Sequence, residues 1–159
     1  MLGRIDRAFR ALLAALMAAM VLSVTWQVVS RYVLGSPSSW TEELSRFLLI
    51  WIGLLGGSYA YHVKMHLGLD LLARKLPPGA RRIQSRFIHV TVIFFAVTAL
   101  IGGGLRLIWL VWELRQHSAA LGVPMALVYC SLPISGLMLV LYAGIALSDT
   151  PASPPPDGV

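Results

Sequence analysis

The sequence predicts an all-α integral membrane protein with four transmembrane helices. Hydrophobic residues make up 57% of the 159 positions and charged residues only 13%, whereas about a quarter of the residues in an ordinary soluble domain are charged. Four apolar stretches each have the roughly 20 residues that a helix needs to cross the hydrocarbon of a bilayer. The strands of a membrane barrel would show alternating polar and apolar positions, and the sequence contains no such segments.

Residues that interrupt helices separate the four predicted spans. We expect the spans at residues 8–34, 40–61, 87–112 and 124–147, within one transmembrane domain over residues 1–147. Gly35-Ser36-Pro37 separates the first two spans, and Pro133 should kink the fourth because proline lacks a backbone N–H. Residues 148–159 form a Pro-rich tail that we expect to be disordered and cytoplasmic.

The amino-terminal segment has some features of a signal peptide, because three arginines precede an apolar run. That run continues from Ala11 to Val29, which is longer than the apolar region of a signal peptide and long enough to span a membrane. We therefore interpret it as a retained first helix.

Basic residues are concentrated before the first span and between spans two and three. Nine of the 13 Lys and Arg residues lie there: Arg4, Arg7, Arg10, Lys64, Arg74, Lys75, Arg81, Arg82 and Arg86. Only Arg31, Arg46 and Arg115 flank the other two loops. Cytoplasmic loops are enriched in Lys and Arg, so both termini are predicted to be cytoplasmic. Anionic membrane lipids then explain the net charge of +6, and nucleic acid is not an expected partner.

The segment between spans two and three predicts a short interfacial amphipathic helix. Its leucines share one helical face and its basic residues the other: Leu69, Leu72 and Leu76 against Arg74 and Lys75. Pro77-Pro78-Gly79 ends this pattern, and an extension of span two is the alternative. His66 and Asp70 are candidate residues at the cytoplasmic interface. They would stack below His62 on a continuous helix, but a metal would need further ligands from elsewhere, so no metal site is predicted.

The densest polar cluster lies between the first two spans. It comprises Arg31, Tyr32, Ser39, Trp40, Glu42, Glu43 and Arg46. The Ser39-x-x-Glu42 spacing predicts a capping box, and both Glu42 and Glu43 are close enough along a helix to pair with Arg46. One interpretation is a capped helix start with an ion pair at the headgroup level, anchored by Trp40. The number of charges favours the other, a contact with a partner subunit.

Small residues recur at spacings that allow transmembrane helices to approach closely. The direct match is Gly53-xxx-Gly57 in span two, and Ala15, Ala19 and Ser23 form a looser stripe in span one. Gly102-Gly103-Gly104 and Gly136 add such positions in spans three and four. We favour packing within a four-helix bundle over packing between subunits as their explanation.

The sequence lacks the motifs of several classes of protein, and this limits the functions that it can have. No nucleotide-binding, hydrolase or metalloprotease motif is present, so the chain is not expected to be an enzyme. The middle of each span lacks the charged residues with which a coupled transporter holds ions and substrate, which favours an accessory subunit. The alternative is the haem-binding anchor of a respiratory complex, with His62 and His89 as axial ligands. A small multidrug exporter is a third possibility, but the first span offers only Gln27 where such proteins place an acidic residue.

The run Arg31-Tyr32-(x7)-Trp40-x-Glu42-Glu43-x-x-Arg46 resembles the signature of the small membrane subunit of tripartite ATP-independent periplasmic (TRAP) transporters, the DctQ-like family. The likeness continues through Trp51, Gly53, Gly57, the His66-(x3)-Asp70 step and Ser118-Ala-Ala-Leu-Gly-Val-Pro124, over nearly the whole chain.

This resemblance implies a three-part importer in the bacterial inner membrane. A periplasmic binding protein captures an organic anion, and a large permease subunit on a separate chain moves it inward with sodium. The small subunit scaffolds the large one and carries no cofactor. The implied subunit-interface residues are Arg31, Tyr32, Trp40, Glu42, Glu43, Arg46, Gly53 and Gly57, with the charged ones toward the periplasm.

Overall fold

In a computed structural model, the chain forms helices joined by short loops. The structure describes the backbone of residues 2–73 and 78–148, and the side chains of residues 6–63 and 83–148. The elements are α1 (Leu2–Tyr32), α2 (Ser39–Ala73), α3 (Pro78–Phe95), the π-helix η1 (Ala96–Gly103), α4 (Gly104–Glu113), α5 (Met125–Tyr129) and α6 (Ser131–Ser148). The tail beyond Ser148, which was predicted to be disordered, lies outside the described residues.

Four segments of the described chain are long and apolar enough to cross a membrane. They are Asp6–Tyr32, Ser39–Val63, Ile83–Glu113 and Met125–Ser148, which confirms the four predicted spans. The third span joins α3, η1 and α4, and the fourth joins α5 and α6. The predicted break after the first span is also present. Gly35 has a φ of +64° and its left-handed conformation ends α1, as glycine commonly does just beyond a helix.

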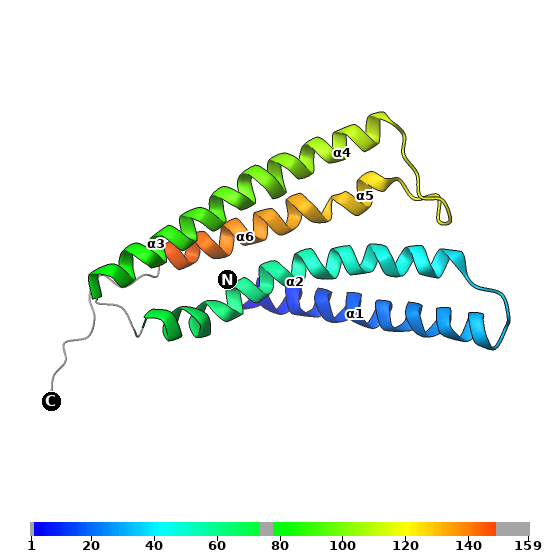
Figure 1. Ribbon diagram of the computed structural model, residues 1–159, viewed down its shortest axis with the longest axis horizontal. Helices are drawn as coiled ribbons and strands as arrows, with labels where there is room; N and C mark the ends of the chain where they lie inside the picture. The colour runs from blue at the N-terminus through cyan, green and yellow to red at the C-terminus, as the bar shows by residue number, and fades with distance from the viewer. Residues whose placement is uncertain (1, 74–77, 149–159) are drawn as a thin grey trace.

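The four spans lie side by side in one layer (Figure 1). Their order is α1, α2, α6 and then span three, because α2 packs against α1 and α6, and α6 packs against α3, η1 and α4. In the most apolar part of each span, 33% of the residues are buried in span four and 6% in span one. The described helices therefore form a layer and not a closed bundle. A layer leaves two broad faces for lipid or for another subunit to cover.

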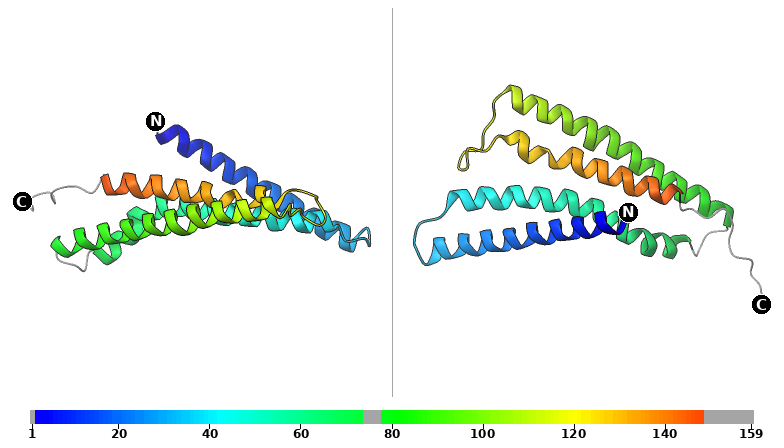
Figure 2. Two further views of the ribbon diagram at one scale, coloured as in Figure 1. Left: turned by 90° about the horizontal axis from the view of Figure 1, so that it is seen from above. Right: turned by 180° about the vertical axis from the view of Figure 1, so that it is seen from behind.

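The first two spans form a hairpin in which α1 crosses α2 at an angle. Seen along the layer, the amino-terminal half of α1 rises out of it (Figure 2). Nearer the connecting loop, the Ser23 hydroxyl lies 3.1 Å from the carbonyl oxygen of Thr41 and 2.9 Å from the hydroxyl of Ser45. These buried polar contacts join the helices without the hydrophobic effect, which does not act between helices in lipid.

The π-helix η1 keeps one face of span three against α6. The buried residues His89, Ala96, Gly104 and Val111 follow one another at spacings of seven, eight and seven residues. Eight residues of α-helix would pass two full turns by about 80°, which would rotate Gly104 away from α6. A π-helix bonds each residue to the fifth one along and so takes more residues per turn, which removes this overshoot.

Two glycines bring the third and fourth spans into close contact. A Cβ atom at Gly104 would lie 2.9 Å from Leu132 Cβ, and one at Gly136 would lie 2.9 Å from both Leu100 Cβ and Ile101 Cγ1. No side chain fits at either position without displacement. For these two glycines, the predicted packing within the chain is confirmed.

The predicted interruption of span four is also confirmed. α5 ends at Tyr129, four residues before Pro133, and α6 begins at Ser131, two residues before it. Proline cannot donate the hydrogen bond that the carbonyl four residues earlier would accept, which disturbs the helix at that point. The Pro133 ring lies where a Gly104 side chain would be, 3.0 Å from the expected Cβ position.

A separate interfacial helix between the second and third spans is not confirmed by the described residues. The backbone of residues 64–73 continues α2 to Ala73, which is the alternative that the sequence allowed. Pro78 begins α3, a first helical position where proline is favoured because its missing N–H has no partner there. Whether the end of α2 lies along the membrane surface stays a prediction.

Candidate subunit interface

The predicted capping box at the start of α2 is not formed. The helix begins at Ser39, so Ser38 occupies the cap position, and its carbonyl accepts bonds from the Thr41 hydroxyl (2.9 Å) and the Glu42 N–H (3.4 Å). The Glu42 carboxylate instead lies 3.2 Å from the Arg46 guanidinium. This predicted pair is confirmed, and both side chains are exposed.

Glu43 does not pair with Arg46, contrary to the second predicted ion pair. Its carboxylate accepts three backbone hydrogen bonds from the loop between α4 and α5, from the N–H groups of Ala119 (3.1 Å), Ala120 (2.9 Å) and Leu121 (2.9 Å). Consecutive N–H groups that converge in this way form an anion-binding concavity. Glu43 therefore ties the first hairpin to the second.

The loop that receives Glu43 is held closed by its own hydrogen bonds. The Ser118 N–H donates to the Val123 carbonyl (2.9 Å) and the Gly122 N–H to the Ser118 carbonyl (3.1 Å), while the Met125 N–H reaches the Gln116 carbonyl (3.0 Å). Gly122 adopts a φ of +67°, which a residue with a side chain rarely does. Spacing along the sequence gives no sign of this contact, because Glu43 and the loop are 76 to 78 residues apart.

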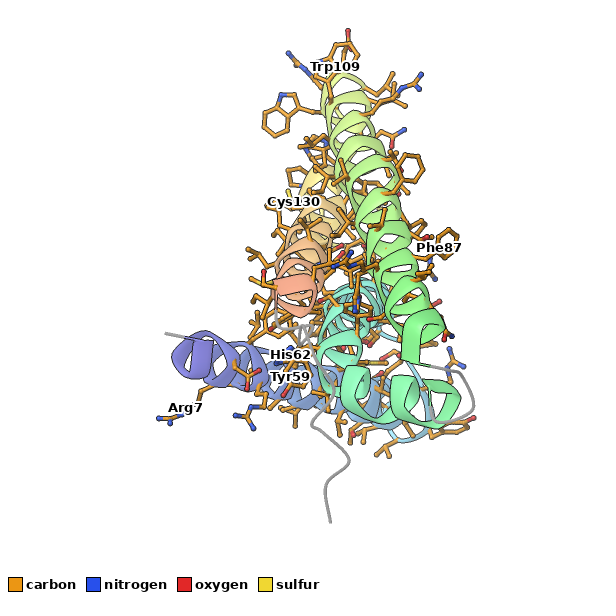
Figure 3. All side chains as sticks on the ribbon, turned by 90° about the vertical axis from the view of Figure 1, so that its left-hand side faces the viewer. Arg7, Tyr59, His62, Phe87, Trp109 and Cys130 are labelled. Atoms are coloured by element: carbon orange, nitrogen blue, oxygen red, sulfur yellow. The ribbon has the colours of Figure 1, made fainter. Side chains whose placement is uncertain are left out.

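A second polar tether joins the hairpins at their opposite ends. The Tyr61 hydroxyl lies 2.6 Å from Nδ1 of the buried His89, whose Nε2 lies 3.3 Å from the Ser85 hydroxyl. Beside it, the His62 ring, which is labelled in Figure 3, stacks on Tyr142 of α6 with ring centroids 4.3 Å apart. Both ring nitrogens of His89 are engaged, so it offers none to a haem iron. The haem-anchor alternative is therefore not supported.

One face of α2 has no partner within the described chain. We call it the open face and define it by exposed residues spaced three or four apart: Glu42, Arg46, Leu49, Gly53 and Gly57. Nothing lies within 4 Å of the position that a Cβ would take at Gly53 or Gly57. The expected packing of this glycine pair inside the chain is therefore wrong.

The open face lies opposite the helix that crosses α2. Phe9 of α1 packs against Tyr59 of α2, with ring centroids 5.9 Å apart. Tyr59 follows Gly57 by two residues, which is about 200° around the helix. The raised half of α1 is thus on the other side of the layer, and nothing from this contact covers the open face.

The remaining sequence-predicted residues fall into two groups. Arg31 and Tyr32 end α1 and Trp40 lies in the first turn of α2; all three are exposed, Tyr32 to 79%. They lie at the same end of the layer as Glu42 and Glu43. His66 and Asp70 belong to the part of α2 whose side chains are outside the described residues.

Comparison with known proteins identifies the class to which this arrangement belongs. The sequence profile of the family described as "Tripartite ATP-independent periplasmic transporters, DctQ component" matches residues 20–150, which is well over half of the chain. The chain belongs to the DctQ family. It is thus a multi-pass membrane protein of the TRAP small permease type, and the resemblance inferred from the sequence is confirmed.

Individual relatives agree with this assignment. The sialic acid TRAP transporter small permease protein SiaQ of Vibrio cholerae is 32% identical over 130 residues, covering 79% of this chain and 70% of SiaQ. The isethionate TRAP transporter permease protein DctMQ of Oleidesulfovibrio alaskensis is 32% identical over 147 residues, covering 87% of this chain and 23% of DctMQ. A Haemophilus influenzae protein named as a TRAP transporter small permease is 31% identical, covering 85% of this chain and 82% of that protein.

Proposed function

We propose that this DctQ-family chain scaffolds the large permease subunit of a TRAP transporter, and that the open face of α2 is where the large subunit packs. The transporter would import an organic anion, delivered by a periplasmic binding protein and driven by sodium. Relatives named for sialic acid and isethionate, two acids, support an anionic substrate. The loops that carry Glu43 and its N–H partners would face the periplasm, with both termini in the cytoplasm, as the distribution of basic residues favours.

The exposed glycine pair carries this proposal. In lipid, small residues favour association because they let the backbones of two helices approach closely. A glycine in a helix interior costs about 1 kcal/mol relative to alanine, so two glycines facing lipid would weaken α2 without a compensating contact. A partner helix seated on Gly53 and Gly57 provides that compensation, and the exposed Glu42–Arg46 pair on the same face supplies a polar contact beside it.

The lack of charged residues in the middle of the spans also supports a scaffold role. Met125–Ser148 contains no Asp, Glu, Lys or Arg, and the central parts of the other three spans are likewise free of them. A coupled transporter binds its ions through such residues or through broken helices at the membrane midplane. A scaffold subunit needs neither, because the large subunit carries that chemistry.

Substituting the two glycines of the open face with a large residue tests the proposal. Gly53→Leu and Gly57→Leu should each lower the amount of large subunit that copurifies with the chain in mild detergent by about tenfold, because overpacking costs about 1–3 kcal/mol. Ala18→Leu adds the same kind of side chain to an exposed position of α1 and is the matched control. Full recovery of the large subunit with both glycine variants would contradict the assigned interface.

A further inference from the structure

The outer half of span three carries a charged side chain that has no ion-pair partner among the described residues. Arg106 lies on α4 and is exposed, and neither ion pair of the described chain includes its guanidinium. It is the only Asp, Glu, Lys or Arg between Arg86 and Glu113. A charge on the lipid-facing surface of a transmembrane helix is costly unless it reaches the headgroups or a partner. Arg106 therefore indicates a ligand.

The position of Arg106 along the span sets the depth of that ligand. Ile83–Glu113 has 31 residues and is about 45 Å long, whereas the hydrocarbon is about 30 Å thick, so roughly 8 Å of helix extends beyond it at each end. Glu113 is seven residues beyond Arg106, or about 10 Å along the axis. The backbone of Arg106 is thus only a few ångströms inside the hydrocarbon boundary. From there, a side chain as long as that of arginine can reach the phosphate level by extending outward.

A carboxylate of opposite charge stands on the same face, two turns further out. Glu113 is exposed and, like Arg106, is in neither ion pair of the described residues. Trp109, 65% exposed, and Leu110, 48% exposed, lie between the two charges. Tryptophan favours the membrane interface, where its ring is apolar and its N–H reaches water or headgroups. This face therefore presents a cation, an amphipathic ring and an anion in order of increasing distance from the membrane centre.

We propose that this face, which we call the α4 lipid face (Arg106, Trp109, Leu110 and Glu113), binds one phosphatidylethanolamine molecule. The guanidinium holds the phosphate through two parallel hydrogen bonds, the geometry in which arginine binds phosphate most strongly. The Glu113 carboxylate accepts hydrogen bonds from the primary ammonium. The cation lies deeper than the anion, as the order of phosphate and amine in this headgroup requires.

Space for an acyl chain lies one helical turn deeper in the membrane than Arg106. Gly102 and Gly103, four and three residues before Arg106, are exposed. A Cβ at either position would meet only carbonyl oxygens of its own helix, at 3.3 Å and 3.9 Å. Without side chains there, a lipid tail can lie against the backbone of η1 while its phosphate reaches Arg106.

The place of α4 in the layer favours lipid over a protein partner. Span three is the outermost helix on its side, and its α4 part packs against α5 and α6. Trp109 lies at the edge of the molecule away from α1 and α2 (Figure 3). Lipid of the outer leaflet reaches this edge even when a large subunit covers the open face of α2.

Native mass spectrometry of the full chain, titrated with phosphatidylethanolamine or phosphatidylglycerol of matched acyl chains, tests the proposal. Arg106→Gln should weaken binding of both lipids about tenfold, because both carry the phosphate. Glu113→Gln should weaken phosphatidylethanolamine about tenfold and leave phosphatidylglycerol as tight or tighter, because only the first has an ammonium. Arg115→Gln removes a charge at the same end of the helix and should change neither.

Circular dichroism establishes that each variant retains its helices. If Arg106→Gln unfolds, Arg106→Lys takes its place, because lysine keeps the positive charge but cannot form the two parallel hydrogen bonds. An unchanged preference for phosphatidylethanolamine in Glu113→Gln would overturn the proposal. So would a loss of copurifying large subunit in Arg106→Gln with lipid binding intact, because Arg106 would then belong to a subunit contact.

Discussion

The contact between spans three and four makes a quantitative prediction at Gly136. A Cβ there would lie 2.9 Å from Leu100 Cβ and from Ile101 Cγ1, and 3.2 Å from the carbonyl oxygen of Ala96. None of these atoms is the end of a flexible side chain, so the helices must separate to admit a methyl group. We therefore expect Gly136→Ala to loosen the packing of α6 on η1.

The magnitude follows from two opposing terms. Overpacking a close contact costs about 1–3 kcal/mol. Alanine gains about 1 kcal/mol over glycine in a helix interior, so the net destabilisation should be up to about 2 kcal/mol. Gly144 is the matched control, because it lies on the same helix and has no atom within 4 Å of its Cβ position. Gly144→Ala should therefore stabilise the chain by about 1 kcal/mol, and the two variants should differ by about 1–3 kcal/mol.

Unfolding of the purified chain by sodium dodecyl sulfate in mixed micelles, followed by circular dichroism, measures this difference. The midpoint should move to lower detergent fraction for Gly136→Ala and to higher fraction for Gly144→Ala. Gly104→Ala should behave like Gly136→Ala, because its Cβ would lie 2.9 Å from Leu132 Cβ. If Gly136→Ala proved as stable as Gly144→Ala, the close approach of the two spans would be refuted.

The two tethers between the hairpins make further predictions. Glu43→Gln should speed hydrogen exchange at the amides of residues 119–121, because these amides lose an anionic acceptor. The control Glu42→Gln should leave their exchange rates unchanged. Equal exchange rates in the two variants would exclude the tether. Tyr61→Phe removes the hydroxyl that lies 2.6 Å from the buried His89 and should lower the free energy of unfolding by about 1–2 kcal/mol in the same micelle assay. An unchanged midpoint for Tyr61→Phe would mean that this bond does not hold the hairpins together.

Much of the fold could be predicted from the sequence, because the features concerned are local. Hydropathy alone indicates the four spans, and Gly35 and Pro133 mark real interruptions. The Glu42–Arg46 pair also follows from spacing along one helix. In each case the physical cause acts within a few residues of its effect.

Apart from the capping box, which the spacing of Ser39 and Glu42 predicted and which is not formed, the errors concern contacts between distant segments. Spacing rules consider Glu43 only beside its own helix neighbours, whereas its carboxylate binds a loop more than 70 residues further along the chain. Likewise, the motif of Gly53 and Gly57 indicates that a helix can come close without indicating which helix. Only the single-layer arrangement reveals that Gly136 packs inside the chain while Gly53 and Gly57 face outward.

The open face of α2 can be tested most directly by cross-linking in the membrane. A photoreactive benzophenone amino acid at Leu49, 55% exposed on that face, should cross-link to the large permease subunit of the same transporter. The same probe at Leu22, 71% exposed on α1, should give markedly less of this product. A cross-link to the large subunit from Leu22 with none from Leu49 would contradict the interface.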